Sequence, residues 1–420
     1  MPIFSRKEET TEIHVSEKHV GLRVFCFVLA LLVAVGAFAF GVTRIGYKDE
    51  GMHDLTAAAD KELPLYSSGV HATIRFRGSS NEIKLALAAA DKVYTEALKQ
   101  AIKLLDAETE YAGTVNLATL NARLNQDVQL SPELYAVLTD AWAKTREQRG
   151  YSLFAGPLQA EWQSILVLTE PEDFDPLRNE DEAARLETIA RWTGDLSQLR
   201  LVTVDAENCV VRLEAPEEYL AFLEEYELKP TVADLNLLRD AYLLELIAPA
   251  LEEAGLSDGY LSSDSGLNLA LSGLDAGQFG LYGFREGSPL LAASAAVTPG
   301  AACSTLTAFS LSAGVNLYYS LEEQGQVHLR NPQLPADGRD RELLLSSCVL
   351  RRDGKLADAC YENLCLWAAN SAQELEELAR ESESAIAWML RGEDGIVLLN
   401  PAAKDGFVPE EGFESRQTEP

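Results

Sequence analysis

Basic residues are scarce in this chain of 420 residues, which carries 35 Lys and Arg against 66 Asp and Glu and has a formal net charge of −31. Such a charge repels the phosphate backbone of nucleic acids and anionic lipid headgroups, so we exclude a nucleic-acid-binding protein. The acidity fits a soluble domain, or one that binds cations or basic partners, and solubility is the simpler account.

Cysteine is also sparse, because the chain has six scattered cysteines and no C-x-x-C motif. This excludes a disulfide-scaffolded domain and gives no zinc-ligand spacing. We expect free or opportunistically paired thiols. No G-x-S-x-G motif is present, so the sequence does not support a Ser/His/Asp hydrolase.

The chain has one long apolar run, residues 24–42, with 19 uncharged residues. About 20 apolar residues cross a bilayer as a helix. Basic residues precede this run (Arg6, Lys7, Lys18, Arg23) more than they closely follow it (Arg44, Lys48). We therefore predict a cytoplasmic tail at 1–23, a transmembrane helix at 24–42 and all later residues outside the cell membrane. The alternative is a cleaved signal peptide, since residues 37–39 (AFA) resemble a cleavage site.

Beyond a juxtamembrane linker at 43–66, the patterns predict one α+β domain at 67–398 and an acidic tail at 399–420. Predicted strands are 71–77, 199–204, 209–213, 259–263, 267–271, 303–312, 316–321 and 343–351. Predicted helices are 81–105, one that starts after Ser131 with Pro132, 234–254 and 356–380. We expect Pro249 to kink or split the third of these and Gly255 to end it. The acidic stretch 170–182 is expected to be a solvated loop.

Short segments in a fixed order carry a resemblance to a known family. They are 117–121 (LATLN), 128–134 (VQLSPEL), 150–158 (GYSLFAGPL) with Trp162, 233–242 (ADLNLLRDAY), 251–255 (LEEAG), 311–314 (LSAG), 328–332 (HLRNP) and 356–362 (LADACYE). Together they resemble the FAD:protein FMN transferase family (ApbE-like). Its members move FMN from FAD onto a Ser or Thr hydroxyl of a partner protein with the help of magnesium.

The resemblance implies a flavin-binding site. It would contain Asp234, Asn236, Leu237, Asp240, Tyr242, Ser312, His328 and Asn331. His328 could act as a base, since an imidazole titrates near neutral pH, or it could have a structural role beside the nucleotide.

Several positions depart from the family's motifs. Asn236 and Leu237 replace two glycines that let the backbone approach the dinucleotide, and Asp240 replaces a lysine that offsets phosphate charge. Ser152 and Asn331 each replace an aspartate. We therefore expect weak FAD binding and no detectable FMN transfer.

Asp358 and Glu362 stand where the family has the Asp and Thr that bind a metal. Carboxylates at positions i and i+4 share one face of a helix and repel each other unless they are exposed or bridged by a cation. A hard cation such as magnesium would accept both as ligands. The pair is thus either a metal site or an exposed acidic pair.

Three functions follow. The first is a membrane-anchored extracytoplasmic protein that keeps the fold but has lost FMN-transfer chemistry, with a flavin-binding or accessory role beside a flavinylated or redox membrane protein. The second is an active, divergent FAD:protein FMN transferase that uses FAD and magnesium. The third is an unrelated surface binding protein.

Overall fold

The computed structural model describes residues 50–418 except 62, 64, 66–67, 169, 230, 286–287, 310–318, 324–325, 331–341, 394 and 405, and it describes the backbone alone at 320, 323 and 326–330. The predicted membrane helix at 24–42 lies outside these residues. Within them, no helix is both long enough and apolar enough to cross a membrane.

The described residues divide into two units, a large one that includes 52–76 and 84–418 and a small one that includes 50–51 and 77–83. In the small unit, the backbone N–H and the hydroxyl of Ser79 donate to Glu82 Oε2 at 2.9 and 2.7 Å. These bonds occupy a backbone donor where helix α2 (Ser80–Leu105) begins.

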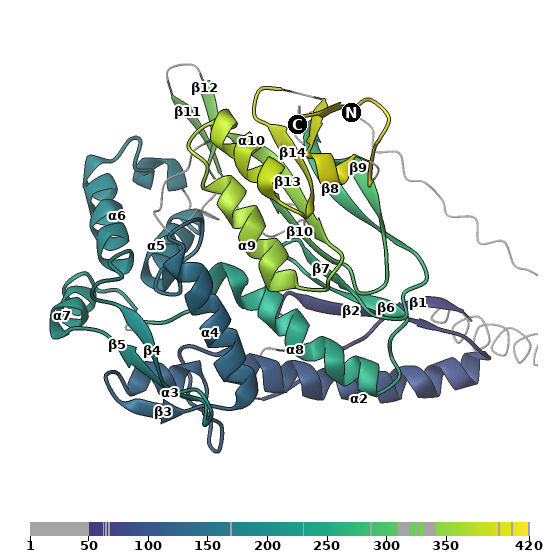
Figure 1. Cartoon of the computed structure of the whole chain (residues 1–420), viewed down its shortest axis with the longest axis horizontal. Coiled ribbons are helices and arrows are strands. Elements are labelled where there is room, and N and C mark those ends of the chain that lie inside the picture. The colour runs from purple at the N-terminus through teal and green to yellow at the C-terminus, as the bar shows by residue number, and fades with distance from the viewer. Residues whose placement is uncertain are drawn as a thin grey trace, which may run out of the picture. The chain divides into compact units, whose positions relative to one another are not determined.

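A sheet of nine strands forms the largest element of the fold (Figure 1). Its order is β1 (Gly51–Asp54), β2 (Val70–Phe76), β6 (Gly259–Ser263), β7 (Leu267–Ala270), β10 (Ala302–Thr307), β13 (Leu344–Arg351), β14 (Ala385–Leu390), β15 (Ile396–Leu399) and β17 (Glu414–Gln417). Neighbours from β2 to β15 pair antiparallel, whereas β17 pairs parallel to β15.

Three smaller sheets complete the strands. They are β16 (Phe407–Pro409), β9 (Ser288–Val297) and β8 (Gly277–Arg285); β3 (Asp127–Gln129), β5 (Val210–Glu214) and β4 (Arg200–Asp205); and β11 (Tyr319–Glu323) with β12 (Gln326–Arg330). The β8–β9 hairpin and the nine-stranded sheet share an apolar core. Members of this core include Phe279, Leu281, Phe309, Cys348, Met389 and Phe413. Burial of these apolar side chains stabilises this part of the fold.

The remaining helices are α3 (Leu117–Ala122), α4 (Pro132–Arg146), α5 (Gly156–Leu166), α6 (Glu180–Thr193), α7 (Glu217–Glu225), α8 (Arg239–Glu253), α9 (Leu356–Trp367) and α10 (Ala372–Glu381), with 3-10 turns η2 (Pro171–Phe174), η3 (Asn236–Leu238) and η4 (Pro401–Ala403). Helix α9 packs on β10 and β13, and α8 lies against α9 (Figure 1). Asn363 Nδ2 donates to the Ser304 carbonyl at 2.9 Å, which fixes α9 on β10.

The α+β class is confirmed, and so are most of the predicted boundaries. Ser131 caps α4 by accepting from Leu134 N, and Gly255 follows α8 with φ of +78°. Pro249 was expected to kink or split α8. The split is wrong, because α8 runs through this residue, whereas the kink stays a prediction. The single helix predicted at 356–380 is also wrong. It divides into α9 and α10, and the Ser371 hydroxyl caps the second by accepting from Glu374 N at 3.2 Å.

The acidic stretch 170–182 is only partly a loop. Its last residues open α6, whose N-cap Asn179 accepts from the backbone of Asp181 and Glu182. Acidic side chains in the first turn favour this helix because they face its positive end. Residues 401–417, expected as an acidic tail, include η4 and strands β16 and β17.

Candidate functional site

The loop that leads into α8 closes on itself through the side chains of Asp234 and Asn236. Asp234 Oδ1 accepts from Asn236 N at 2.7 Å, and Asn236 Oδ1 accepts from Leu237 N at 2.7 Å. Asn236 Nδ2 donates to the carbonyls of Ser152 and Asp234 at 3.1 and 2.9 Å. The backbone N–H groups of 236 and 237 therefore already have acceptors within the loop.

Asn236 has φ of +37°, in the left-handed region that glycine adopts without strain. Asparagine tolerates this region better than most residues, because its short amide can bond to the local backbone. The backbone of this loop thus keeps a conformation that suits glycine, while the amide of Asn236 fills the space that glycine would leave open.

A cavity of about 350 Å³ lies beside this loop, and we call it the α8 cavity. Asp234, Asn236, Leu237 and Asp240 line it, and the binding of a flavin by these four residues stays a prediction. Its volume is at the lower end of the range for small-molecule sites. Lys229 also lines it.

Two carboxylates, Asp234 and Asp240, and two cations, Lys229 and Arg239, line the α8 cavity. Burial raises the pKa of Asp240, against the lowering effect of Arg239 and of the Ser265 hydroxyl, which donates to Asp240 Oδ2 at 2.8 Å. Burial likewise raises the pKa of Asp234. Both carboxyl groups therefore resist ionisation in this cavity more than in water.

These residues do not fit a bound pyrophosphate. A phosphate-binding loop offers free N–H groups and positive charge. Here the N–H groups of 236 and 237 are bonded within the loop, and the carboxyl group of Asp240 lines the cavity beside it. Lys229 pairs with Glu108 at 2.6 Å, so part of its charge is already compensated.

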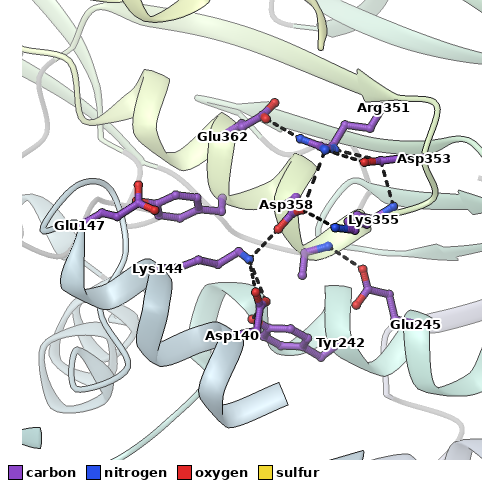
Figure 2. A network of polar contacts seen from close by, with 12 residues as sticks. Asp140, Lys144, Glu147, Tyr242, Glu245, Arg351, Asp353, Lys355, Asp358 and Glu362 are labelled. Carbon is purple, nitrogen blue, oxygen red and sulfur yellow. Dashed lines mark hydrogen bonds and ion pairs between the residues drawn. The ribbon is translucent and has the colours of Figure 1, made fainter. Parts of the chain in front are cut away.

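The second group of predicted site residues lies on α9 (Figure 2). Asp358 Oδ1 accepts from Lys144 Nζ of α4 at 2.6 Å, and Glu362 Oε1 accepts from Arg351 Nη1 at 2.6 Å. Arg351 also donates to Asp353 Oδ2 at 2.6 Å. Each carboxylate of the pair thus has a cationic partner from the chain.

This arrangement does not fit a magnesium ion shared by Asp358 and Glu362. The carboxylates bond to Lys144 and Arg351, and the described residues hold no group of three or more His, Cys, Asp or Glu side chains that could bind a metal. Magnesium binding at this pair stays a prediction. Both side chains are 28% exposed, so the pair is also not a fully solvated one.

The loop residues and the α9 pair do not line the same cavity. Asp358 and Glu362 border a separate cavity of about 840 Å³, whereas Cys360 of the same helix borders the α8 cavity. Residues two apart on a helix point in different directions, which separates the two sets. Tyr242 lies instead with the polar residues around α9, which we call the α9 group. Its hydroxyl donates to Asp140 Oδ2 at 2.7 Å, and Asp140 contacts the same lysine, Lys144, as Asp358 does.

The other predicted residues are His328, Ser312 and Asn331. The backbone of His328 lies in β12 opposite Leu321 of β11. Ser312 and Asn331 lie outside the described residues. The roles predicted for these three in flavin binding or catalysis stay predictions.

Residues that the sequence did not single out complete the α9 group. Asp140 and Lys144 are four apart on α4, a spacing typical of a helical ion pair. Glu245 Oε1 accepts from Ala357 N at 2.9 Å, near the start of α9. Helical spacing alone could have predicted the ion pair of Asp140 and Lys144, but the contact of Lys144 with Asp358 depends on the fold.

Comparison with solved structures agrees with this fold. An ApbE protein from Thermotoga maritima matches with a TM-score of 0.54 and 14% identity, over 84% of this chain and 97% of that one. The flavin transferase ApbE from Vibrio cholerae matches with a TM-score of 0.53 and 11% identity, over 85% of this chain and 99% of that one. No family model matches the sequence, and neither does any curated protein. The likeness therefore shows a shared fold, as the ordered motifs predicted.

Proposed function

We propose that this chain is a membrane-anchored, extracytoplasmic protein that keeps the flavin-transferase fold and does not transfer FMN. Its role would be to bind a flavin without turnover, or to assist a flavinylated or redox membrane protein. The observation that carries the proposal is the closure of the loop before α8, where Asn236 and Asp234 occupy the N–H groups of 236 and 237.

Transfer of FMN from FAD requires the pyrophosphate to be held in line with the incoming hydroxyl. Like charges 4 Å apart repel by about 4 kcal/mol at an effective dielectric constant of about 20. The effect of Asp240 on a nearby phosphate should be smaller than this limit, because its side chain is 23% exposed and its pKa is raised by burial. Combined with the loss of two N–H donors, it opposes a bound dinucleotide.

The direct test is release of AMP from FAD by the full-length chain, with magnesium and a Thr-bearing acceptor peptide. We expect none above the level of the peptide alone. Magnesium-dependent AMP release that disappears in Asp358→Ala would overturn the proposal and establish an active transferase.

A triple variant tests the assignment of the loop. Asn236→Gly, Leu237→Gly and Asp240→Lys together should tighten FAD binding, measured by quenching of flavin fluorescence, because they free the N–H group of 237 and supply positive charge. A matched triple variant with Asp240→Glu in place of Lys keeps the negative charge and should gain less. If neither variant changes the affinity, the loop does not contact the flavin.

An active, divergent transferase is the alternative, and one observation favours it. Lys229 and Arg239 both line the α8 cavity and could supply the positive charge that Asp240 does not. If the wild-type chain binds FAD, Arg239→Gln should weaken that binding under this alternative. An exposed cation away from the cavity, such as Lys84, gives a control substitution to Gln.

The membrane topology rests on the apolar run 24–42 and on the charge bias around it. Protease added to intact cells should remove residues beyond about 66 and spare the N-terminal tail. A large domain that becomes sensitive only after lysis would show the opposite orientation. An N-terminus that starts near residue 40 in the purified protein would indicate cleavage of a signal peptide.

A further inference from the structure

Lys144 lies between two carboxylates that come from different helices. Its Nζ contacts both oxygens of Asp140 at 2.8 and 2.7 Å, and Asp358 Oδ1 at 2.6 Å. The lysine side chain is only 7% exposed, whereas Asp140 and Asp358 are 44% and 28% exposed. The buried ammonium thus contacts three carboxylate oxygens. Figure 2 shows Lys144 between Asp140, on the same helix α4, and Asp358 on α9.

Neighbouring groups hold these carboxylates in place. The Tyr242 hydroxyl donates to Asp140 Oδ2 at 2.7 Å, and Arg351 Nη2 lies 3.9 Å from Asp358 Oδ2. Lys144 Nζ also lies 5.9 Å from the centre of the Tyr361 ring, which favours a cation at this point. The carboxylates are therefore positioned from several sides around one positive charge.

We propose that the ammonium of Lys144 takes the place of a bound metal ion between α4 and α9, so that this part of the fold is held together without a divalent cation. A hard metal ion and an ammonium both accept a shell of carboxylate oxygens, and here the chain itself supplies the cation. Its tether to α4 makes it permanent, whereas a metal ion would exchange with solvent. This role concerns how α4 and α9 are held together, and its test does not measure FMN transfer.

The contacts of Lys144 with three carboxylate oxygens favour its positively charged form. Removal of the charge would leave Asp140 without the cation that contacts it here and Asp358 with the more distant Arg351 and Lys355, each 3.9 Å away.

The test is thermal unfolding of the full-length chain with EDTA or with millimolar Mn²⁺. The wild-type melting temperature should be the same in both. Lys144→Met removes the charge with little change of volume, so it should melt several degrees lower in EDTA and regain much of that loss in Mn²⁺. Adding Asp358→Asn to Lys144→Met should abolish the regain, because it removes one ligand.

Two control variants separate the ammonium from general effects of charge. Lys144→Arg keeps the positive charge and should stay insensitive to Mn²⁺. Lys355→Met removes another cation beside Asp358, at 3.9 Å, but that side chain is 67% exposed. It should leave both the melting temperature and the insensitivity to Mn²⁺ unchanged. Equal Mn²⁺ responses of Lys144→Met and Lys355→Met would contradict the proposal.

Binding of Mn²⁺ to the wild type gives a test that does not need Lys144→Met to fold. Electron paramagnetic resonance counts the free and the bound ion. The proposal is overturned if the wild type binds Mn²⁺ and Asp358→Asn removes that binding, and it is supported if Asp358→Asn leaves the amount of bound Mn²⁺ unchanged. These readouts do not measure AMP release from FAD, so the failure of the Lys144 proposal leaves the proposed function standing. Magnesium-dependent AMP release through Asp358 would instead count against both.

Discussion

Replacing Asn236 by Gly and by Ala in parallel tests how the loop before α8 is held. Both changes remove the three hydrogen bonds of the side-chain amide. One is accepted from Leu237 N, and two are donated to the carbonyls of Ser152 and Asp234. They differ in the backbone, because Ala resists the φ of +37° that position 236 adopts, whereas Gly does not.

The magnitudes follow from these contacts. A typical hydrogen bond contributes about 0.5–1.5 kcal/mol, and water can replace part of the loss in a cavity-lining loop, so Asn236→Gly should cost about 1–3 kcal/mol. Left-handed backbone costs a residue with a Cβ about 1–2 kcal/mol, and the greater freedom of Gly in the unfolded chain offsets about half of that. Asn236→Ala should therefore be less stable than Asn236→Gly by about 1 kcal/mol.

Urea unfolding followed by circular dichroism measures both differences, provided that the slopes of the three transitions agree. Asn236→Ser is a useful third variant, because it keeps a short polar side chain but loses the amide donor. If Asn236→Ala is as stable as Asn236→Gly, position 236 does not hold a left-handed conformation in solution, and the account of the loop fails.

Three further predictions follow from buried groups. Asp240→Asn should raise the melting temperature near pH 7 and have little effect near pH 4. Burial raises the pKa of Asp240, so the stability that its protonated form gives is present at low pH and is lost as pH rises through the folded pKa. Thermal unfolding measured as a function of pH tests this. Gly150→Ala should destabilise the fold by about 3 kcal/mol or more, because the Cβ of the alanine would lie 2.2 Å from the Leu364 carbonyl oxygen of α9. Chemical denaturation measures this loss, and an unchanged midpoint would mean that residue 150 and Leu364 do not approach so closely. Burial raises the pKa of the Cys360 thiol to about 12, so alkylation at pH 8 followed by mass spectrometry should label the partly exposed Cys209 first and Cys360 only after unfolding.

Local signals in the sequence predicted much of the fold. The Ser131 cap with Pro132 placed the start of α4, and the apolar periodicity of 81–105 placed α2. The break between α9 and α10 was also readable, since Ser371 and Glu374 have the spacing of a capping pair, but a continuous apolar pattern across 356–380 outweighed it. The β8–β9 hairpin was missed, because its small residues give weak alternation.

The candidate site was predictable only in part. The replacement of glycine by Asn236 indicated a filled loop, and the structure shows that its amide fills it. The contact between Lys144 and Asp358 joins residues 214 positions apart, and no local pattern encodes such a distance. The i, i+4 spacing on α9 suggested that Asp358 and Glu362 act as a pair, whereas in the fold Asp358 pairs with Lys144 of α4.

The last strand protects the sheet from association with other chains. β17 (ESRQ) is polar and exposed along its length and forms one edge of the nine-stranded sheet beside the apolar β15 (IVLL). An apolar strand with unpaired backbone groups is a template for association between chains, and charged edge strands prevent this. A chain truncated before Glu414 would leave β15 as the edge, so we expect it to self-associate where the full-length chain does not.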